Sequence, residues 1–353
     1  MPKASISKGI CANWSPDGEY CVIKARSGRQ IWAFDERRGL FRQPPEQPVQ
    51  LTSGPIRWFN PVPSKDGKTI FAAGSTLRGE LSRFDPKIRQ FQPFLGGISA
   101  DLVAFSKDGQ AVAYVSYPDG ILWRANKDGR ERIQLTSPPL RPDSVSWSPD
   151  GSQIAFMSQS ERIGTENAYI VSSQGGVHTR LLPEDGGSQS DPSWSPDGRK
   201  MIFGTKLMGE QNGEIHILDV ATRQITTLPG SAGSFSPHWS PDGQSIAASS
   251  FDTSKMLLFD FKTQKWSTIY KSPAAYTAWS SDGRFLYFVK YTGDDAVLRM
   301  PARGGPPETV VSLKDFPYTG TLGLWFGLDP SDAPILLRDV GTQDVYALAL
   351  ERK

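Results

Sequence analysis

Short apolar runs alternate with turn-forming segments along the whole chain, and almost no stretch has the spacing of an amphipathic helix. Runs of this length that are rich in β-branched and aromatic residues and bounded by Gly, Pro or Asp are typical of β-strands. One group of runs follows a repeated Asp-Gly turn, at residues 20–23, 70–73, 111–115, 154–157, 201–203, 246–248 and 285–289. A second group comes later in each unit, at residues 30–35, 80–85, 121–125, 168–172, 214–219, 256–260 and 297–300. The pattern predicts an all-β protein.

The turn between the runs has the motif Trp-Ser-Pro-Asp-Gly. It is complete at residues 14–18, 147–151, 194–198 and 239–243, varied at 64–67, 105–109 and 279–283, and degraded at 328–332. Pro presets φ for a turn, Asp can accept a hydrogen bond from the backbone ahead of it, and Gly takes the positive φ of a tight reversal. The Gly-to-Gly spacings are 49, 42, 42, 47, 45 and 40 residues. A period of this length is typical of four-stranded propeller blades.

The repeats predict a single β-propeller domain over residues 1–353, with eight four-stranded blades favoured over seven. The residues around and after the eighth motif supply three strands, and residues 5–10 could supply a fourth. N- and C-terminal strands would then close the ring within one blade and remove an open sheet edge. A seven-bladed ring would leave one hairpin over and stays the alternative.

Charge and apolar content argue against two classes of protein, direct nucleic-acid binders and membrane-spanning proteins. The chain has 39 basic and 37 acidic side chains, so it has no basic excess of the kind that direct nucleic-acid binding requires. No stretch approaches the roughly 20 apolar residues of a membrane span, and no signal-peptide core is visible. We therefore expect a soluble chain without membrane insertion.

The cysteines give little indication of a bond or a metal site. An even-membered hairpin at the first motif would place Cys11 opposite Val22, with Cys21 on the other sheet face. This arrangement disfavours a disulfide, and no Cys or His cluster accompanies the pair.

The Trp-Ser-Pro-Asp-Gly turn, the apolar strand after it and the later strand ending in Asp resemble TolB-like (WD40-like) β-propeller repeats over essentially the whole chain. Residues 50–55 (Gln-Leu-Thr-Ser-Gly-Pro) and 337–348 resemble the C-terminal propeller of bacterial multidomain regulators. Those regulators carry an N-terminal winged-helix or serine/threonine kinase domain, which this chain lacks. The resemblance implies a sensing or scaffolding role, and by analogy with periplasmic TolB it implies protein or peptide partners. It favours a periplasmic location, while a cytoplasmic one stays open because no signal peptide is visible.

Motifs typical of catalysis or phosphate binding are missing from the sequence. No Gly-x-Ser-x-Gly nucleophile elbow and no phosphate-binding Gly-rich loop occurs. The motif aspartates are interpreted as turn residues, and His178, His216 and His238 occupy unrelated repeat positions, so we expect no metal and no cofactor. These observations lean against an enzyme without excluding one.

Ligands are therefore expected at the loops that enter the inner strands, which meet on one rim of a propeller. The rim candidates are Arg57, Trp58, Asn60, Asp101, Arg141, Asp143, Asp191, His238 and Tyr276. The leading hypothesis is a non-catalytic sensor or interaction module whose rim binds a protein, peptide or small molecule. The alternative is a lyase or hydrolase acting in the central channel. A cluster of carboxylates, His and Arg with perturbed protonation at the channel mouth would favour the enzyme. Aromatic candidates such as Trp58 could instead only fill space between blades.

Overall fold

The computed structural model describes residues 13–24, 30–35, 48–159, 166–182, 187–205, 213–321 and 323–350. Within these ranges the chain is built from strands, with one short 3-10 segment, η1 (Leu95–Gly97). The strands form eight sheets, as many as the predicted blades; seven have four strands and one has three. The predicted all-β class is confirmed.

The chain divides into two compact units. Residues 1–78 and 340–353 belong to unit 1, and residues 79–339 belong to unit 2. The single domain predicted for residues 1–353 stays a prediction that an excision experiment can test.

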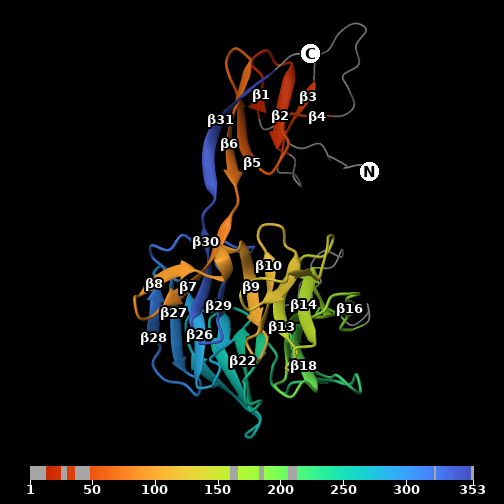
Figure 1. Ribbon diagram of the computed structural model, residues 1–353, viewed down its shortest axis with the longest axis vertical. Helices are drawn as coiled ribbons and strands as arrows, with labels where there is room; N and C mark the ends of the chain where they lie inside the picture. The colour runs from red at the N-terminus through yellow and green to blue at the C-terminus, as the bar shows by residue number, and fades with distance from the viewer. Residues whose placement is uncertain are drawn as a thin grey trace. The chain divides into compact units, whose positions relative to one another are not determined.

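Unit 2 contains six antiparallel sheets (Figure 1). Four consecutive strands form each of the first five sheets, and the sixth joins strands from both ends of the unit. The first three sheets contain β9 (Ala100–Phe105), β10 (Ala111–Ser116), β11 (Leu122–Asn126) and β12 (Ile133–Gln134); β13 (Pro142–Trp147), β14 (Gln153–Gln159), β15 (Glu166–Ser172) and β16 (Thr179–Arg180); and β17 (Ser190–Trp194), β18 (Lys200–Thr205), β19 (Glu214–Asp219) and β20 (Ile225–Thr227). The other three contain β21 (Ser234–Trp239), β22 (Ser245–Ser250), β23 (Met256–Asp260) and β24 (Lys265–Tyr270); β25 (Ala275–Trp279), β26 (Phe285–Lys290), β27 (Ala296–Pro301) and β28 (Glu308–Ser312); and β29 (Phe326–Leu328), β30 (Pro334–Asp339), β7 (Gly79–Asp85) and β8 (Gln90–Pro93).

These six sheets close a ring. The inner strands contact one another in the cyclic order β9, β13, β17, β21, β25 and β29, and β29 contacts β9 again. The last sheet locks the ring because β30 pairs with β7, with Leu337 opposite Leu81. Strands from the two ends of unit 2 thus share one blade, as closure of a propeller requires. Residues 5–10, which the sequence predicted as a closing strand, lie outside the described residues.

The core of unit 2 lies between neighbouring sheets. Six apolar clusters occur, each built from two adjacent sheets around the ring. Between the second and third sheets, for example, Ala155 packs with Trp194 and Phe203. Burial of these side chains from water drives the sheets together, so every blade depends on both of its neighbours.

Unit 1 contains the other two sheets. One has β1 (Asn13–Trp14), β2 (Tyr20–Lys24), β3 (Ile31–Asp35) and β4 (Val49–Gln50); the other has the order β31 (Thr342–Ala349), β6 (Thr69–Thr76) and β5 (Arg57–Pro63). A shared apolar core includes Val22 and Ile31 from the first sheet and Trp58 and Ile70 from the second.

The first hairpin corrects the expectation for the cysteines. Asn13, rather than Cys11, lies opposite Val22, and Cys21 lies opposite Trp14. Cys21 is disulfide-bonded, so the sequence-based expectation against a disulfide was wrong. The chain's only other cysteine is Cys11, which lies outside the described residues.

The repeated turn has the same hydrogen bonds in copy after copy. In the copy at residues 147–151, the Ser148 hydroxyl donates to Asp150 Oδ1 at 2.6 Å and accepts from the Gln153 amide at 2.9 Å. The Gly151 amide donates to the Ser148 carbonyl, and Gly151 has a φ of +72°. The motif Asp is thus a turn residue, as predicted, and the motif Ser is its partner.

Candidate binding site at the mouth of the ring

Five of the six inner strands of unit 2 are interrupted near their start by a β-bulge. In each bulge one residue other than glycine has a φ near +50°: Leu102, Ser144, Asp191, Ser236 and Tyr276. This left-handed conformation is uncommon for side chains as bulky as Leu and Tyr. A bulge turns side chains away from the regular alternation of a strand. The repeat therefore places a β-bulge near the start of these inner strands, where the side chains depart from the regular alternation.

Ionisable side chains gather at these bulges. We call Asp101, Asp143, Asp191, His238 and Tyr276 the mouth cluster; they come from β9, β13, β17, β21 and β25 in turn. Charges link the members in pairs: Asp101 and Asp191 act on Asp143, while Tyr276 and His238 each respond to at least one of these carboxylates. Burial and the charges of Asp191, Asp101 and Glu166 raise the pKa of Asp143 to about 7, against an opposing hydrogen bond from the Ser144 amide. A carboxyl group in this cluster therefore titrates near neutral pH.

Asp101 is the most buried member, with 1% of its surface exposed. Its Oδ2 accepts a hydrogen bond from the Thr321 amide at 2.6 Å, and its Oδ1 accepts one from the Thr321 hydroxyl at 3.3 Å. Burial raises the pKa of Asp101, and the two Thr321 hydrogen bonds oppose this effect. The segment between β28 and β29 is thus attached to the cluster through a buried carboxyl group.

The charges of the carboxylates also act on the pKa values of Tyr276 and His238. Burial and the charges of Asp143 and Asp101 raise the pKa of Tyr276 to about 12, so its hydroxyl stays protonated at neutral pH. Burial lowers the pKa of His238, while the charge of Asp191 acts in the other direction. The His238 ring also lies 3.4 Å from the Ser236 hydroxyl, measured from its Nε2. Both side chains are predominantly in the neutral form at neutral pH.

No described cationic side chain forms a salt bridge with the carboxylates of the mouth cluster, Asp101, Asp143 and Asp191. The same ranges contain no group of three or more His, Cys, Asp or Glu side chains arranged to hold a metal ion. Several carboxyl groups therefore share a partly desolvated site without a positive charge from the described chain, which is costly unless one is protonated or a ligand compensates.

Of the other four candidate residues, three belong to unit 1 and one is an exposed residue of unit 2. Arg57, Trp58 and Asn60 are on β5 of unit 1. Trp58 is 4% exposed and packs edge-on against Tyr346 with ring centroids 5.0 Å apart, so it fills the core of unit 1. Arg141 is exposed just before β13, with its amide donating to the Ser158 hydroxyl. The structure thus brings together five of the nine residues predicted from the sequence.

Two contributors were missing from the sequence-based set. Thr321 precedes the last inner strand, so the rule that selected the other candidates could have found it. Glu166 begins β15 and acts on Asp143 through space. No local sequence signal marks Glu166, because its effect depends on how β13, β14 and β15 align side by side within one sheet.

Comparisons with known proteins agree with the repeat analysis. No family model matches the chain. A Chlorobium chlorochromatii protein named as a TolB homolog is 30% identical over 190 residues, which cover 51% of this chain and 39% of that protein. The Bacillus subtilis strain 168 protein named as uncharacterized peptidase YuxL is 29% identical over 195 residues, covering 52% of this chain and 28% of that protein. The matches thus span well under half of these relatives' length.

Solved structures extend the likeness in fold. TolB from Agrobacterium tumefaciens superimposes with a TM-score of 0.60 at 20% identity, covering 75% of this chain and 99% of that one. An oligogalacturonate lyase in complex with manganese superimposes with a TM-score of 0.50 at 15% identity, covering 82% of this chain and 87% of that one. The fold is that of a TolB-like β-propeller, as the sequence motifs predicted. Propellers of this fold include an enzyme as well as TolB proteins, so the fold alone does not decide the function.

Proposed function

We propose that this chain is a non-catalytic binding module, and that its mouth cluster takes a positively charged group from a protein or peptide partner. The observation that carries this proposal is the convergence of Asp101, Asp143 and Asp191 without a salt bridge among the described residues. A cation placed there would compensate both the burial and the neighbouring negative charges that raise the pKa of Asp143.

The residue types favour a guanidinium or ammonium group as the ligand's anchor. Carboxylates accept charge-assisted hydrogen bonds from Arg or Lys, and an aromatic ring such as that of Tyr276 attracts a cation to its face. The inner strands hold these side chains on a closed ring, so little ordering entropy is lost on binding. The output would pass to an attached domain or to the bound partner.

Calorimetric titration with a short capped peptide tests the proposal. We expect acetyl-Gly-Arg-Gly-amide to bind and the same peptide with citrulline in place of arginine to bind at least tenfold more weakly, because citrulline has nearly the same shape without the charge. Asp143→Asn and Asp191→Asn should weaken the arginine peptide, while Asp294→Asn, an exposed control, should not. Equal affinity for the two peptides would contradict a cationic anchor.

A second candidate function is favoured by the pKa of Asp143. A carboxyl group titrating near 7 beside Tyr276 and His238 is suited to general acid–base catalysis at neutral pH. Because an oligogalacturonate lyase shares the fold, the first assay is oligogalacturonate with manganese, followed by the ultraviolet absorbance of an unsaturated product. Turnover that Asp143→Asn abolishes would replace the binding proposal with an enzymatic one.

We further propose a periplasmic location. The disulfide of Cys21 supports it, because such bonds persist mainly in oxidising compartments. In the described residues, no helix has the length and apolar character to cross a bilayer. Thiol titration of protein purified without reductant should detect no free thiol before reduction and two after it. Two free thiols before reduction would remove this support.

A further inference from the structure

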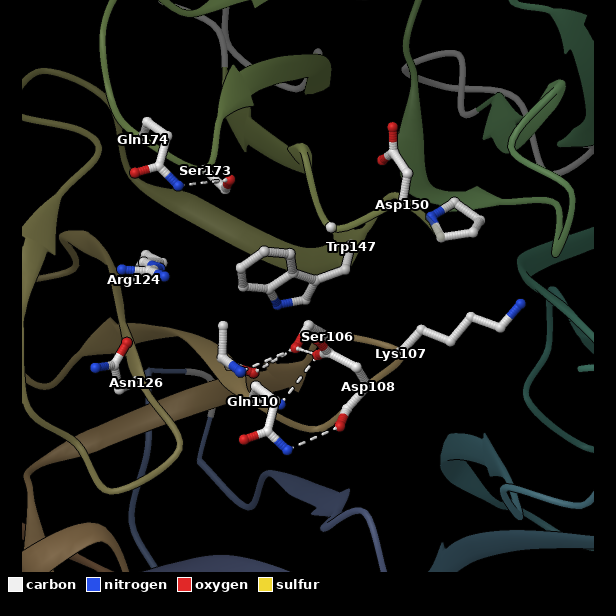
Figure 2. Close-up of a pocket in the computed structure, with 13 residues that line it drawn as sticks. Ser106, Lys107, Asp108, Gln110, Arg124, Asn126, Trp147, Asp150, Ser173 and Gln174 are labelled. Atoms are coloured by element: carbon white, nitrogen blue, oxygen red, sulfur yellow. Dashed lines mark hydrogen bonds between the residues drawn. The ribbon is translucent and has the colours of Figure 1, made fainter.

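A pocket lies between the sheets β9–β12 and β13–β16, at the opposite end of β9 from Asp101. Its volume is about 510 Å³. The lining is mostly polar and includes Lys107, Arg124, Asn126, Ser173 and Gln174, with Trp147 as the aromatic member. Figure 2 shows Arg124 between Gln174 and Asn126, across from the indole ring of Trp147. We call this pocket the interblade cleft.

Arg124 occupies a position that recurs around the ring. It lies two residues before the end of the third strand of its sheet, where the other sheets have Arg83, Ile170, Ile217, Leu258 and Arg299. Three blades therefore place an arginine at this site and three place an aliphatic residue. The comparison shows that the fold does not require an arginine there.

The other two arginines have carboxylate partners. Arg83 donates from Nε to Asp329 and from a terminal nitrogen to the Ser331 hydroxyl at 2.9 Å. Arg299 donates from Nε to Glu308 and also reaches the Tyr287 hydroxyl at 3.4 Å. At both sites the neutralising carboxylate comes from the sheet that carries the arginine or from the turn next to one of its strands.

Arg124 differs from both. Its Nε is buried and has no hydrogen-bond partner, and the described residues form no salt bridge with it. The two acids that line the cleft are held in their own turns: Asp108 accepts from the Ser106 hydroxyl at 2.6 Å, and Asp150 accepts from the Ser148 hydroxyl at 2.6 Å. A buried donor without a partner is costly, and Lys107 adds a second positive charge to the lining.

We propose that the interblade cleft binds a small anionic ligand whose carboxylate or phosphate group pairs with Arg124. The planar guanidinium suits bidentate pairing with either group. The amides of Asn126 and Gln174 can donate and accept hydrogen bonds, so they suit hydroxyl groups next to the anion. The ligand class is thus a hydroxylated acid or phosphate ester, which the mouth cluster with its carboxylates would repel.

Three related probes test the charge requirement on the whole chain: glycerate, glycerol 3-phosphate and uncharged glycerol. Trp147 is a suitable reporter because its Nε1 is fixed by a hydrogen bond to the Ala104 carbonyl at 3.0 Å. The chain labelled with 5-fluorotryptophan would be titrated by ¹⁹F NMR, with the Trp147 signal assigned from Trp147→Phe. We expect glycerate, glycerol 3-phosphate or both to shift that signal saturably, and glycerol to leave it unchanged. Comparison of the two acids distinguishes a carboxylate site from a phosphate site.

Arg124→Ile provides the matched variant, because Ile170 and Ile217 occupy the same position in two other blades. It should keep the wild-type melting temperature or raise it, and weaken the anionic probe roughly ten- to hundredfold, since hydrogen bonds to charged groups are the strong ones. Arg124→Gln checks the result should the isoleucine variant fold poorly. Arg199→Gln removes an exposed arginine that directly follows the turn at residues 194–198, and this variant should bind like the wild type. The proposal is overturned if no acid shifts Trp147, if glycerol acts like the acids, or if loss of Arg124 leaves the affinity unchanged.

Discussion

The Asp101 carboxylate accepts a hydrogen bond from the Thr321 amide at 2.6 Å, across 220 residues of sequence. This contact ties the first complete sheet of unit 2 to the segment that leads into the last inner strand. Because the group is buried, its loss should be felt in stability as well as in binding.

Asp101→Ala should lower the free energy of unfolding by about 1–3 kcal/mol, because it removes two hydrogen bonds and leaves the Thr321 amide without its acceptor. Chemical denaturation monitored by circular dichroism measures the change. Asp294→Ala, at an exposed position, is the control and should stay within about 0.5 kcal/mol of the wild type. A loss at Asp101 no larger than at Asp294 would show that the contact is not formed in solution.

The raised pKa of Asp143 predicts how the free energy of unfolding depends on pH. Its pKa rises from 3.8 in the unfolded chain to about 7 in the folded one. Between about pH 4 and 7 the folded state therefore keeps a proton that the unfolded state has lost, so this group's contribution to stability falls as pH rises through that window. The full effect is at most roughly 4 kcal/mol.

Asp143→Asn removes this titration. Relative to the wild type, the variant should gain stability at pH 8 and show little difference at pH 4, as measured by denaturation across the range. The proposed cationic ligand should bind the wild type more tightly as pH rises through about 7, because binding needs the ionised carboxylate. A pH-independent difference between the two proteins would mean that Asp143 titrates normally.

Ser148→Ala tests the turn chemistry. The hydroxyl donates to Asp150 and accepts from the Gln153 amide, so its removal should cost about 1–2 kcal/mol of unfolding free energy. Thermal melting of Ser148→Ala beside Ser152→Ala provides a comparison, since Ser152 contacts the same carboxylate from an exposed position. If both variants melt alike, the hydroxyl of Ser148 has no special role in the turn.

Excision of residues 79–339 tests the independence of unit 2. The pairing of β30 with β7 closes its six sheets without any strand of unit 1, so the fragment should fold cooperatively and keep the mouth cluster. Size-exclusion chromatography, circular dichroism and peptide titration would measure this. An unfolded or aggregated fragment would instead support the single domain predicted for residues 1–353.

The rim candidates show which residues of the site could be predicted from the sequence. Selecting residues that enter inner strands found all five members of the mouth cluster, because the repeat fixes where each inner strand begins. The same rule selected Trp58, which the structure buries in the core of unit 1. Position in the repeat predicts which end of the strand a residue occupies, but not whether a neighbouring sheet covers it.

By itself, the sequence determined the strands, the turns and the number of sheets, because these depend on local chemistry: Pro and Gly dihedral preferences, the Ser–Asp hydrogen bond and the alternation of apolar residues. Tertiary structure alone decided that six sheets close a ring in residues 79–339 and that Leu337 pairs with Leu81. It also decided that Asp101 and Asp191 act on Asp143, while the described residues give Arg124 no carboxylate partner. These outcomes depend on contacts between residues far apart in sequence, where burial and charge act through space and no local pattern records them.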